Sequence, residues 1–450
     1  MTKEAEPAQV PEAKQAGDIR TRWSWVEPSV WTDRMLTALE EGVKGGVWFS
    51  LIDKVASKRN LEAAAAKVIA NRGGAGVDHV SVRGFQRRIA EEVDKLHTSL
   101  LAGTYQPQAI RRVHIPKPGS SEKRPLGIPT VRDRVVQTAL RNVLEPIFEQ
   151  TFAEQSYGFR PQRGCKDALR RVAKLLVEGY TWVLDADLKS YFDTIAHEQL
   201  MQLVRQRVAD RRVLRLIESF LQQAVLEELR EWRPGAGTPQ GAVISPLLAN
   251  VFLNPLDHMV AQAGFEIVRY ADDFVVLCRT QAEAQRALDL IREWTERVEL
   301  RLHPTKTKII GLDARNGFDF LGYHFRRSRH KPNKINRWPR DKSLKRLRET
   351  LRPPTKRSNG HSLSFIITKI NPILRGWFAY YKHSTIPSDF RALDGWVRQR
   401  LRSILRRRRK RKGRGRGADH QRWPNDYFAA LGLFSLVAAH AQAVRQASRR

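Results

Sequence analysis

The chain has 450 residues, more than a single hydrophobic core usually serves, because such cores stop growing at roughly 250–300 residues. It carries 80 Lys and Arg against 47 Asp and Glu, a formal net charge of +33, which favours polyanionic partners such as nucleic acids. Its two cysteines, Cys165 and Cys278, exclude a disulfide framework and any zinc module built on four cysteines.

The N-terminal part is predicted to be helical after a disordered start. The first residues are rich in Pro, Ala, Glu and Lys and show no hydrophobic period. Apolar residues then recur at helical spacing between Val30 and Ala70, and again between Phe85 and Leu101. The glycine-rich stretch from Asn71 to Val80 is typical of a turn, although such a cluster can also cradle a phosphate.

The next part of the chain mixes strands with helices. Two short extended stretches are predicted between Val113 and Thr130, around a Pro-Gly-Ser-Ser turn. Helices are predicted from Asp133 to Phe148 and from Lys166 to Glu178. The stretch from Thr181 to Leu188 is apolar, β-branched and short, which predicts a buried strand.

Further helices alternate with one hairpin. They are predicted from His197 to Val208 and onward to about Glu228, from Val243 to Val260, and from Gln281 to Val298. Between the last two, residues Phe265 to Arg279 form two β-branched runs around a polar Ala-Asp-Asp tip, which indicates a hairpin followed by further short strands. The elements interleave without a regular βαβ repeat, so the predicted fold class is α+β.

The positive charge is concentrated towards the C-terminus. Residues Arg326 to Gly417 include 30 Lys and Arg against four acids, with aromatic residues interleaved. Basic groups hold phosphates and aromatic faces stack on unpaired bases, so this segment predicts a folded nucleic-acid surface. A solvated face or a disordered tail is the alternative for its arginine run. The apolar stretch from Tyr427 to Val444 is interrupted by polar residues and predicts a packed helix, not a membrane span.

Two carboxylate clusters suggest chemistry. Asp185 and Asp187 are two residues apart on a predicted strand, so they share a face, and Asp272 and Asp273 occupy the predicted hairpin tip. If the strand end lies beside the hairpin, the carboxylates meet at one sheet edge, an arrangement that suits hard cations such as Mg²⁺. Ordinary turn chemistry is the alternative explanation for the Asp-Asp pair taken alone.

The motifs and their order carry a resemblance to a known family. Three central motifs occur in order: DADLKSYFD (Asp185–Asp193), TPQGAVISPLLAN (Thr238–Asn250) and YADD (Tyr270–Asp273). Before them come IPKPGSSEKRPLGIPT and SYGFRPQRG, and after them come LHPTKTKI and FDFLGYHF. KINPILRGWFAYY (Lys369–Tyr381) comes later. In order and content the chain resembles the bacterial reverse transcriptases encoded by group II introns, and the last motif resembles their maturase domain.

The resemblance implies a right-hand polymerase with fingers, a palm, a mostly α-helical thumb and a helical N-terminal extension. The implied segments are a disordered tail (1–25), the mainly helical extension (26–100), the fingers and palm (101–325), the strongly basic thumb or maturase domain X (326–417) and a short C-terminal segment of DNA-binding type (418–450).

The resemblance also implies a metal site. Asp187 would be the first ligand and Asp272 the second, with Asp273 beside it as a candidate third. Two Mg²⁺ ions at such a site activate an attacking hydroxyl and stabilise the leaving oxygen in phosphoryl transfer. No zinc is expected.

The nucleotide-binding residues follow from the same motifs. Phe192 matches the bulky gate whose ring leaves no room for a ribose 2′-OH, and Gln240 matches a residue lining the nucleotide pocket. Lys117 and Arg124 match the cations that clamp the triphosphate. Lys306 is the candidate general acid for the pyrophosphate leaving group.

Contacts to RNA are expected from two regions. Arg160 and Arg163 are predicted template contacts, with surface salt bridging as the alternative. In the basic segment Trp377 either stacks on a base or packs between helices. The remaining predicted RNA-binding residues are arginines: Arg375, Arg406, Arg407, Arg408 and Arg409.

The implied function is that of an RNA-directed DNA polymerase that binds its intron RNA, assists splicing as a maturase and copies the RNA into DNA by target-primed reverse transcription for retrohoming. Its partners would be the intron RNA, a DNA target or primer and dNTPs, in the bacterial cytoplasm or at the nucleoid, and no membrane. Many relatives end in an HNH endonuclease with cysteine pairs, and because this chain lacks such pairs no DNA nicking is expected.

Three alternatives remain at the level of the sequence. The first is an RNA-binding splicing factor without polymerase activity, which the intact set of acids disfavours. The second is an RNA-dependent RNA polymerase, which Phe192 disfavours because ribonucleotides need polar room for their 2′-OH. The third is a domesticated or defence-linked reverse transcriptase.

Overall fold

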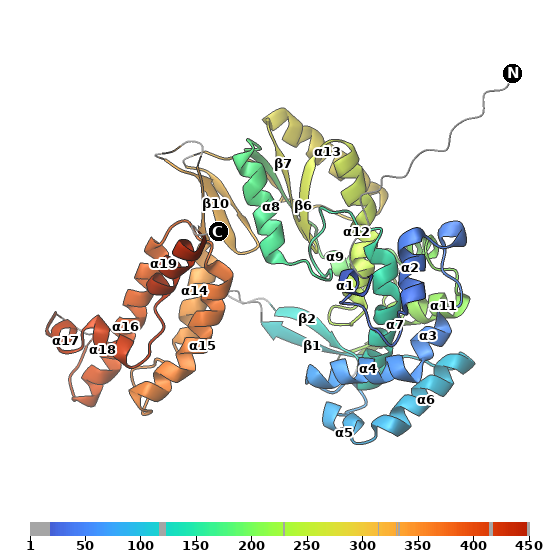
Figure 1. Cartoon of the computed structure of the whole chain (residues 1–450), viewed down its shortest axis with the longest axis horizontal. Coiled ribbons are helices and arrows are strands. Elements are labelled where there is room, and N and C mark those ends of the chain that lie inside the picture. The colour runs from blue at the N-terminus through green and yellow to red at the C-terminus, as the bar shows by residue number, and fades with distance from the viewer. Residues whose placement is uncertain are drawn as a thin grey trace.

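The computed structural model describes residues 19–116, 123–227, 230–313, 315–329, 331, 334–413 and 417–447. Figure 1 shows three regions: N-terminal helices (blue) at one side, a central sheet with its helices, and a group of C-terminal helices (orange to red) at the other side. We call residues 317–447, beginning at β9, the C-terminal lobe. The predicted α+β class is confirmed, because helices and three separate sheets share the chain.

The N-terminal helices pack around one long helix, α7 (Val131–Glu149). Their contacts include buried polar pairs: Asn60 donates to the Ala139 carbonyl at 3.0 Å, and Asn142 donates to Asn60 at 2.8 Å. The helical region expected between Val30 and Leu101 is present as several short helices: α2 (Asp33–Glu41), the 3₁₀ turn η1 (Lys44–Gly46), α3 (Ile52–Ala56), α4 (Lys58–Ala70), α5 (Val82–Gln86) and α6 (Ile89–Ala102). The prediction of a disordered tail over residues 1–25 is wrong for its last part, because α1 (Ile19–Arg22) forms there, and residues 1–18 lie outside the described residues.

The central sheet is antiparallel and has the strand order β6-β7-β3-β8. Its inner strands are β3 (Trp182–Asp187) and β7 (Asp273–Cys278), flanked by β6 (Glu266–Tyr270) and β8 (Lys308–Gly311). One face, with Leu184 and Val276, belongs to the core formed with α12 (Ser245–Gln262) and α13 (Gln281–Arg297), and the other face packs on α8 (Cys165–Val177). Both faces are buried because these strands are continuous apolar runs.

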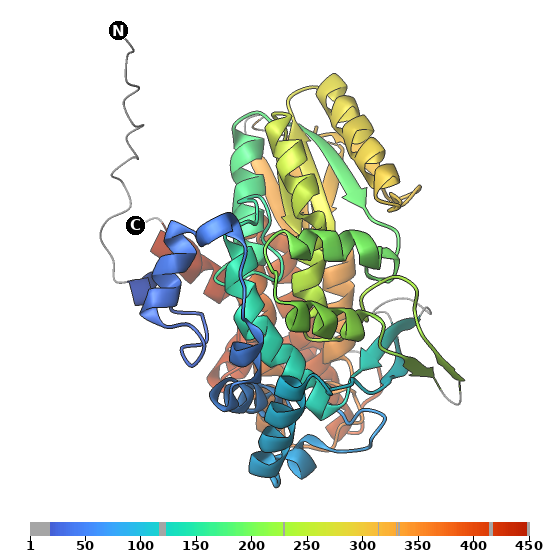
Figure 2. The same ribbon diagram turned by 90° about the vertical axis from the view of Figure 1, so that its right-hand side faces the viewer.

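A second, smaller sheet has the order β2-β1-β4-β5 and projects from one side of the molecule, as the teal and green strands of Figure 2 show. Its strands are β1 (Ile110–Pro116), β2 (Lys123–Ile128), β4 (Val225–Glu227) and β5 (Arg230–Trp232).

The prediction that helical structure continues to about Glu228 is wrong. After α9 (Tyr191–Thr194) and α10 (His197–Arg205), α11 (Arg211–Leu221) ends and the chain forms β4. Val225 pairs with Ile110 in a parallel bridge, so tertiary pairing decides the conformation of this short apolar stretch.

The C-terminal lobe begins with a three-stranded sheet and continues as helices. The sheet has the order β11-β10-β9, and the predicted limit between residues 325 and 326 falls inside its middle strand. Its elements are β9 (Gly317–Phe320), β10 (Tyr323–Arg327), β11 (Ile335–Pro339), α14 (Asp341–Leu351), α15 (Leu363–Tyr381), α16 (Ser388–Arg408), α17 (Gly417–Arg422), α18 (Asn425–Ala430) and α19 (Leu436–Ala447).

The single helix predicted from Tyr427 to Val444 is two helices. The chain turns after α18 at Gly432, whose φ is +79°, and the amides of Leu436 and Val437 donate to Asp394 at the start of α19. Across the described residues no helix combines the length and the apolar character that crossing a membrane requires.

Candidate active site

The predicted carboxylates come together at one end of the central sheet. Asp187 is the last residue of β3 and pairs in register with Asp273, the first residue of β7. Asp185 lies two residues earlier on the same face of β3, and Asp272 occupies the two-residue turn that joins β6 to β7. Two segments almost ninety positions apart in the chain thus meet by strand pairing.

The pKa values of Asp273, Asp185 and Asp272 reflect burial and repulsion between carboxylates. Burial, together with repulsion from Asp185, Asp272 and Asp187, raises the pKa of Asp273 to about 7. Burial also raises the pKa of Asp185 to about 6, against the opposing effect of Lys308. The pKa of Asp272 is raised, again chiefly by burial and in part by Asp187. A cation bound among such carboxylates would offset their mutual repulsion, so the cluster favours cation binding.

Two lysines lie beside the carboxylates and partly offset their negative charge. Lys306 donates to the Asp187 carboxylate with an Nζ–Oδ2 distance of 2.7 Å, and Lys308 lies opposite Asp185 in the register of β8 and β3. Lys306 was predicted from its motif, and it does reach the carboxylate cluster.

The donor set fits magnesium in its chemistry. The described part of the chain contains no group of three His, Cys, Asp or Glu side chains arranged to hold a metal without help. Mg²⁺ in phosphoryl-transfer sites usually takes one or two carboxylates and completes its shell with water and substrate phosphate oxygens. Asp187 and Asp272 offer such oxygens, so an ion here would depend on the substrate for its remaining ligands.

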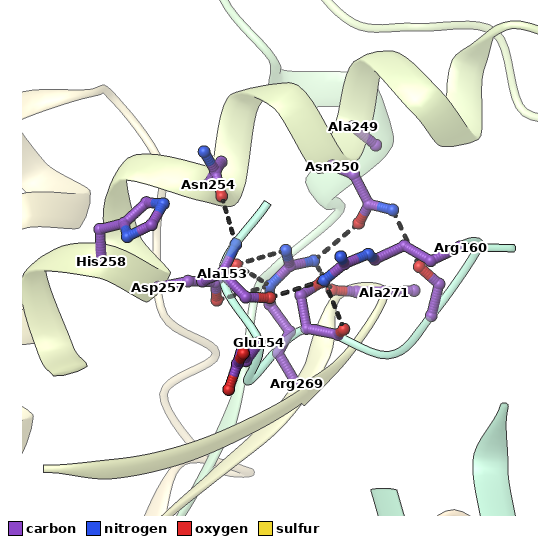
Figure 3. Close-up of polar contacts among 12 residues, drawn as sticks. Ala153, Glu154, Arg160, Ala249, Asn250, Asn254, Asp257, His258, Arg269 and Ala271 are labelled. Carbon is purple, nitrogen blue, oxygen red and sulfur yellow. Dashed lines mark hydrogen bonds and ion pairs between the residues drawn. The ribbon is translucent and has the colours of Figure 1, made fainter. Parts of the chain in front are cut away.

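A buried arginine supports the turn that carries Asp272. Arg269 is fully buried in β6, and its guanidinium pairs with both oxygens of Asp257 on α12, the closest contact being 2.5 Å (Figure 3). The same guanidinium donates to Asn250 at 2.9 Å and to the Ala271 carbonyl at 2.8 Å. The hairpin tip is thereby tied to α12.

The loop before α8 holds the other side of this turn. Its backbone exchanges hydrogen bonds with Arg269 through Gln155 and Tyr157, and Asn250 donates to the Gly158 carbonyl at 2.8 Å. A Cβ at Gly158 would lie only 2.2 Å from the Ala271 nitrogen, so glycine is required for this approach.

Sequence reasoning missed this support. The available signal was a charged residue at an inward position of an apolar strand, Arg269, together with Asp257 within an apolar helix. Buried charges of opposite sign usually pair.

A cavity of about 310 Å³ lies between the second sheet, helix α9 and the loop that precedes α12. Two predicted nucleotide-binding residues, Phe192 and Gln240, line it. Backbone hydrogen bonds join its walls: Gly127 donates to the Gln240 carbonyl and Thr238 to the Phe192 carbonyl, both at 2.7 Å. Its volume is within the usual range for small-ligand sites.

The other predicted nucleotide contacts differ in their placement. Arg124 is exposed on β2 and does not line the cavity, and Lys117 lies outside the described residues. Two residues not predicted to line the cavity do so, Arg112 and Asp193. Burial raises the pKa of Asp193 and the positive charge of Arg112 opposes that effect, so an acid and a base both line the cavity.

Arg160 does not face a nucleic acid, contrary to the prediction. Its side chain is 3% exposed, pairs with Glu149 at 2.7 Å and donates to the Ser156 carbonyl. It also donates to the Ala153 carbonyl, which lies beside it in Figure 3. Arg163 is half-buried, donates to the Glu154 carbonyl at 2.6 Å and lies over the Tyr157 ring. Both arginines shape the loop that supports the hairpin.

The predicted RNA contacts of the C-terminal lobe also separate into packed and exposed residues. Trp377 is half-buried against Tyr381, with ring centroids 4.6 Å apart, so the packing alternative holds. Arg406 pairs with Asp419 at 2.6 Å and is a structural residue, contrary to the prediction. The residues that stay exposed are arginines: Arg375 and Arg409, which lie over aromatic rings, Arg408, which donates to the His361 carbonyl, and Arg407.

Comparisons with known proteins agree with this geometry. Residues 115–325 match the family described as "Reverse transcriptase (RNA-dependent DNA polymerase)", and residues 344–423 match "Group II intron, maturase-specific domain". Protein YkfC of Escherichia coli K12 is 37% identical over 309 residues, which cover 59% of this chain and 80% of YkfC.

The names of two further relatives state that they are encoded in introns. The group II intron-encoded protein LtrA of Lactococcus lactis subsp. cremoris is 42% identical over 179 residues, which cover 40% of this chain and 30% of LtrA. A 91 kDa protein in the cob intron of Schizosaccharomyces pombe is 40% identical over 168 residues, which cover 37% of this chain and 21% of that protein. The matched regions thus span less than a third of these two relatives.

Proposed function

The chain belongs to the family of group II intron reverse transcriptases and maturases, and from this premise we propose that it binds an intron RNA, assists its splicing and copies it into DNA. The observation that supports the polymerase activity is the meeting of Asp187, Asp272 and Asp273 at one sheet end, with a cavity nearby that holds Phe192 and Gln240.

In this proposal Asp187 and Asp272 hold two Mg²⁺ ions, with Asp273 as a third carboxylate. Bound there, the ions would activate the primer 3′-hydroxyl and stabilise the leaving oxygen. Phe192 excludes the ribose 2′-OH by its bulk, and Gln240 lines the pocket for the incoming dNTP. Lys306, already 2.7 Å from Asp187, is the group able to give a proton to the pyrophosphate oxygen.

Binding of the triphosphate and of the RNA is proposed from charge. Lys117 and Arg124 would clamp the triphosphate, and the exposed basic surface of the C-terminal lobe would hold the intron RNA by neutralising its phosphates. A DNA target strand supplies the primer, as target-primed reverse transcription and retrohoming require.

Primer extension by variants tests the proposed polymerase. Purified protein is given an RNA template, a DNA primer and dNTPs, and Asp272→Asn is compared with Asp289→Asn, which changes an exposed carboxylate on α13. We expect the wild type and the control to extend the primer and the Asp272 variant to lose extension by several orders of magnitude. RNA affinity should be equal in all three proteins. Full extension by the Asp272 variant would refute the proposal.

A further inference from the structure

A second cavity, of about 200 Å³, lies where the central region meets the C-terminal lobe. Leu169 of α8 and Tyr323 of β10 are its buried lining residues, and Tyr380 near the end of α15 lines it as well. Helix α8 packs against β11, so the two parts of the molecule are in contact beside the cavity.

Four basic side chains and no acidic one line this cavity among the described residues. Lys166 and Arg170 come from α8, Arg337 from β11, and His383 follows α15. Arg170 pairs with Asp167 at 2.8 Å, and Asp167 does not itself line the cavity. The cavity thus collects positive charge from two sides of a junction.

Arg337 lies partly buried without a carboxylate partner. Its Nε donates to the His383 carbonyl at 2.8 Å, and within the described residues it forms no ion pair with a carboxylate. Arg160 and Arg269, which are more deeply buried, each pair with a carboxylate. A cation withdrawn from water without a counter-charge is unfavourable, so an anion beside Arg337 would stabilise this arrangement.

We propose that this cavity binds a phosphate group of a nucleic-acid strand and thereby bridges the central region and the C-terminal lobe. The inference rests on the proposed function for the identity of the strand. A guanidinium binds phosphate oxygens through two parallel hydrogen bonds, and the lysine and the second arginine add charge from the opposite wall. Tyr380, which is half-buried, gives the adjoining sugar or base an aromatic surface.

The salt dependence of binding measures such a contact directly. The cavity variant combines Arg337→Gln with Lys166→Gln. The control variant combines Lys174→Gln on α8 with Arg286→Gln on α13. The control removes the same amount of charge, but from exposed positions that do not line the cavity. The probes are a labelled RNA stem-loop and a labelled RNA/DNA hybrid of equal length. For each protein the slope of log affinity against log salt concentration is measured.

We expect the slope of the cavity variant to fall by about one relative to the control, because one phosphate contact is lost. A fall with the stem-loop alone assigns the phosphate to structured RNA, and a fall with the hybrid alone assigns it to the primer–template duplex. Equal slopes for the cavity variant and the control with both probes would overturn the proposal. If the double variant unfolds in a thermal melt, Lys166→Gln alone replaces it, since Lys166 is exposed.

This test is separate from the proposed polymerase activity. Equilibrium binding needs neither dNTPs nor the carboxylates, so a protein that failed to extend primers would still report on the cavity. Conversely, the cavity variant should retain dNTP incorporation at saturating primer–template.

Discussion

Phe192 lies in the cavity wall with its ring edge-on to Tyr191, at a centroid distance of 5.4 Å. Phe192→Ala removes the ring, so we expect the preference for dNTPs over NTPs to fall by roughly tenfold or more, within the range that single pocket contacts supply. Single-nucleotide incorporation with each substrate measures the ratio. Phe192→Tyr keeps the ring and should keep the preference, and an unchanged ratio in the alanine variant would remove the gate assignment.

Arg269 carries a prediction about both stability and activity. Arg269→Met leaves the Asp257 carboxylate buried and unpaired, which should lower the free energy of unfolding by about 3–5 kcal/mol. Urea unfolding measures that loss.

The double variant Arg269→Met with Asp257→Leu separates the two effects. Removing both charges should restore most of the stability, because an apolar pair often replaces a buried ion pair without loss. Primer extension should stay impaired, since the Ala271 carbonyl next to Asp272 has still lost its donor. A stable double variant with wild-type activity would show that Arg269 only contributes to folding.

The β6–β7 hairpin and the loop before α8 act as one unit, and Gly158 is the position where they touch. Gly158→Ala would bring a Cβ to 2.2 Å from the Ala271 nitrogen, so the turn must move. A shift of ~1 Å at a reacting centre costs about a hundredfold in rate. We therefore expect primer extension to fall by tenfold to a hundredfold.

Gly395→Ala provides the matched control for this element. Gly395 lies in α16 and nothing comes within 4 Å of a Cβ built there, so activity and stability should be unchanged or slightly improved. Equal activity of the two alanine variants would mean that the loop does not position the hairpin.

The elements themselves were largely predictable from hydrophobic periodicity. The hairpin at Phe265–Arg279 and the strand at Thr181–Leu188 were expected from β-branched runs, and both are present. What periodicity does not contain is pairing at a distance. The strand at Val225 forms because Ile110 lies beside it, and Arg160 is buried because Glu149 accepts its donors.

At the scale of the whole molecule, the central region and the C-terminal lobe share one hydrophobic cluster. Val183 and Val275 of the central sheet belong to the same cluster as Phe318, Leu347 and Ile367 of the lobe. The composition predicted a basic lobe but not this shared core, because contacts between distant segments leave no local pattern. Cutting the chain before the lobe would expose that core, so RNA-binding tests need the full chain.

The central claim is that Asp187 and Asp272 together hold the ions at which a primer is extended. Its most direct test is a calorimetric titration of Mg²⁺ into a complex of the protein. The complex contains an RNA template, a dideoxy-terminated DNA primer and the next dNTP. We predict that the wild-type complex binds Mg²⁺ and that Asp187→Asn and Asp272→Asn complexes bind it far more weakly, while Asp289→Asn behaves as the wild type. Equal Mg²⁺ affinity in all four complexes would contradict the claim.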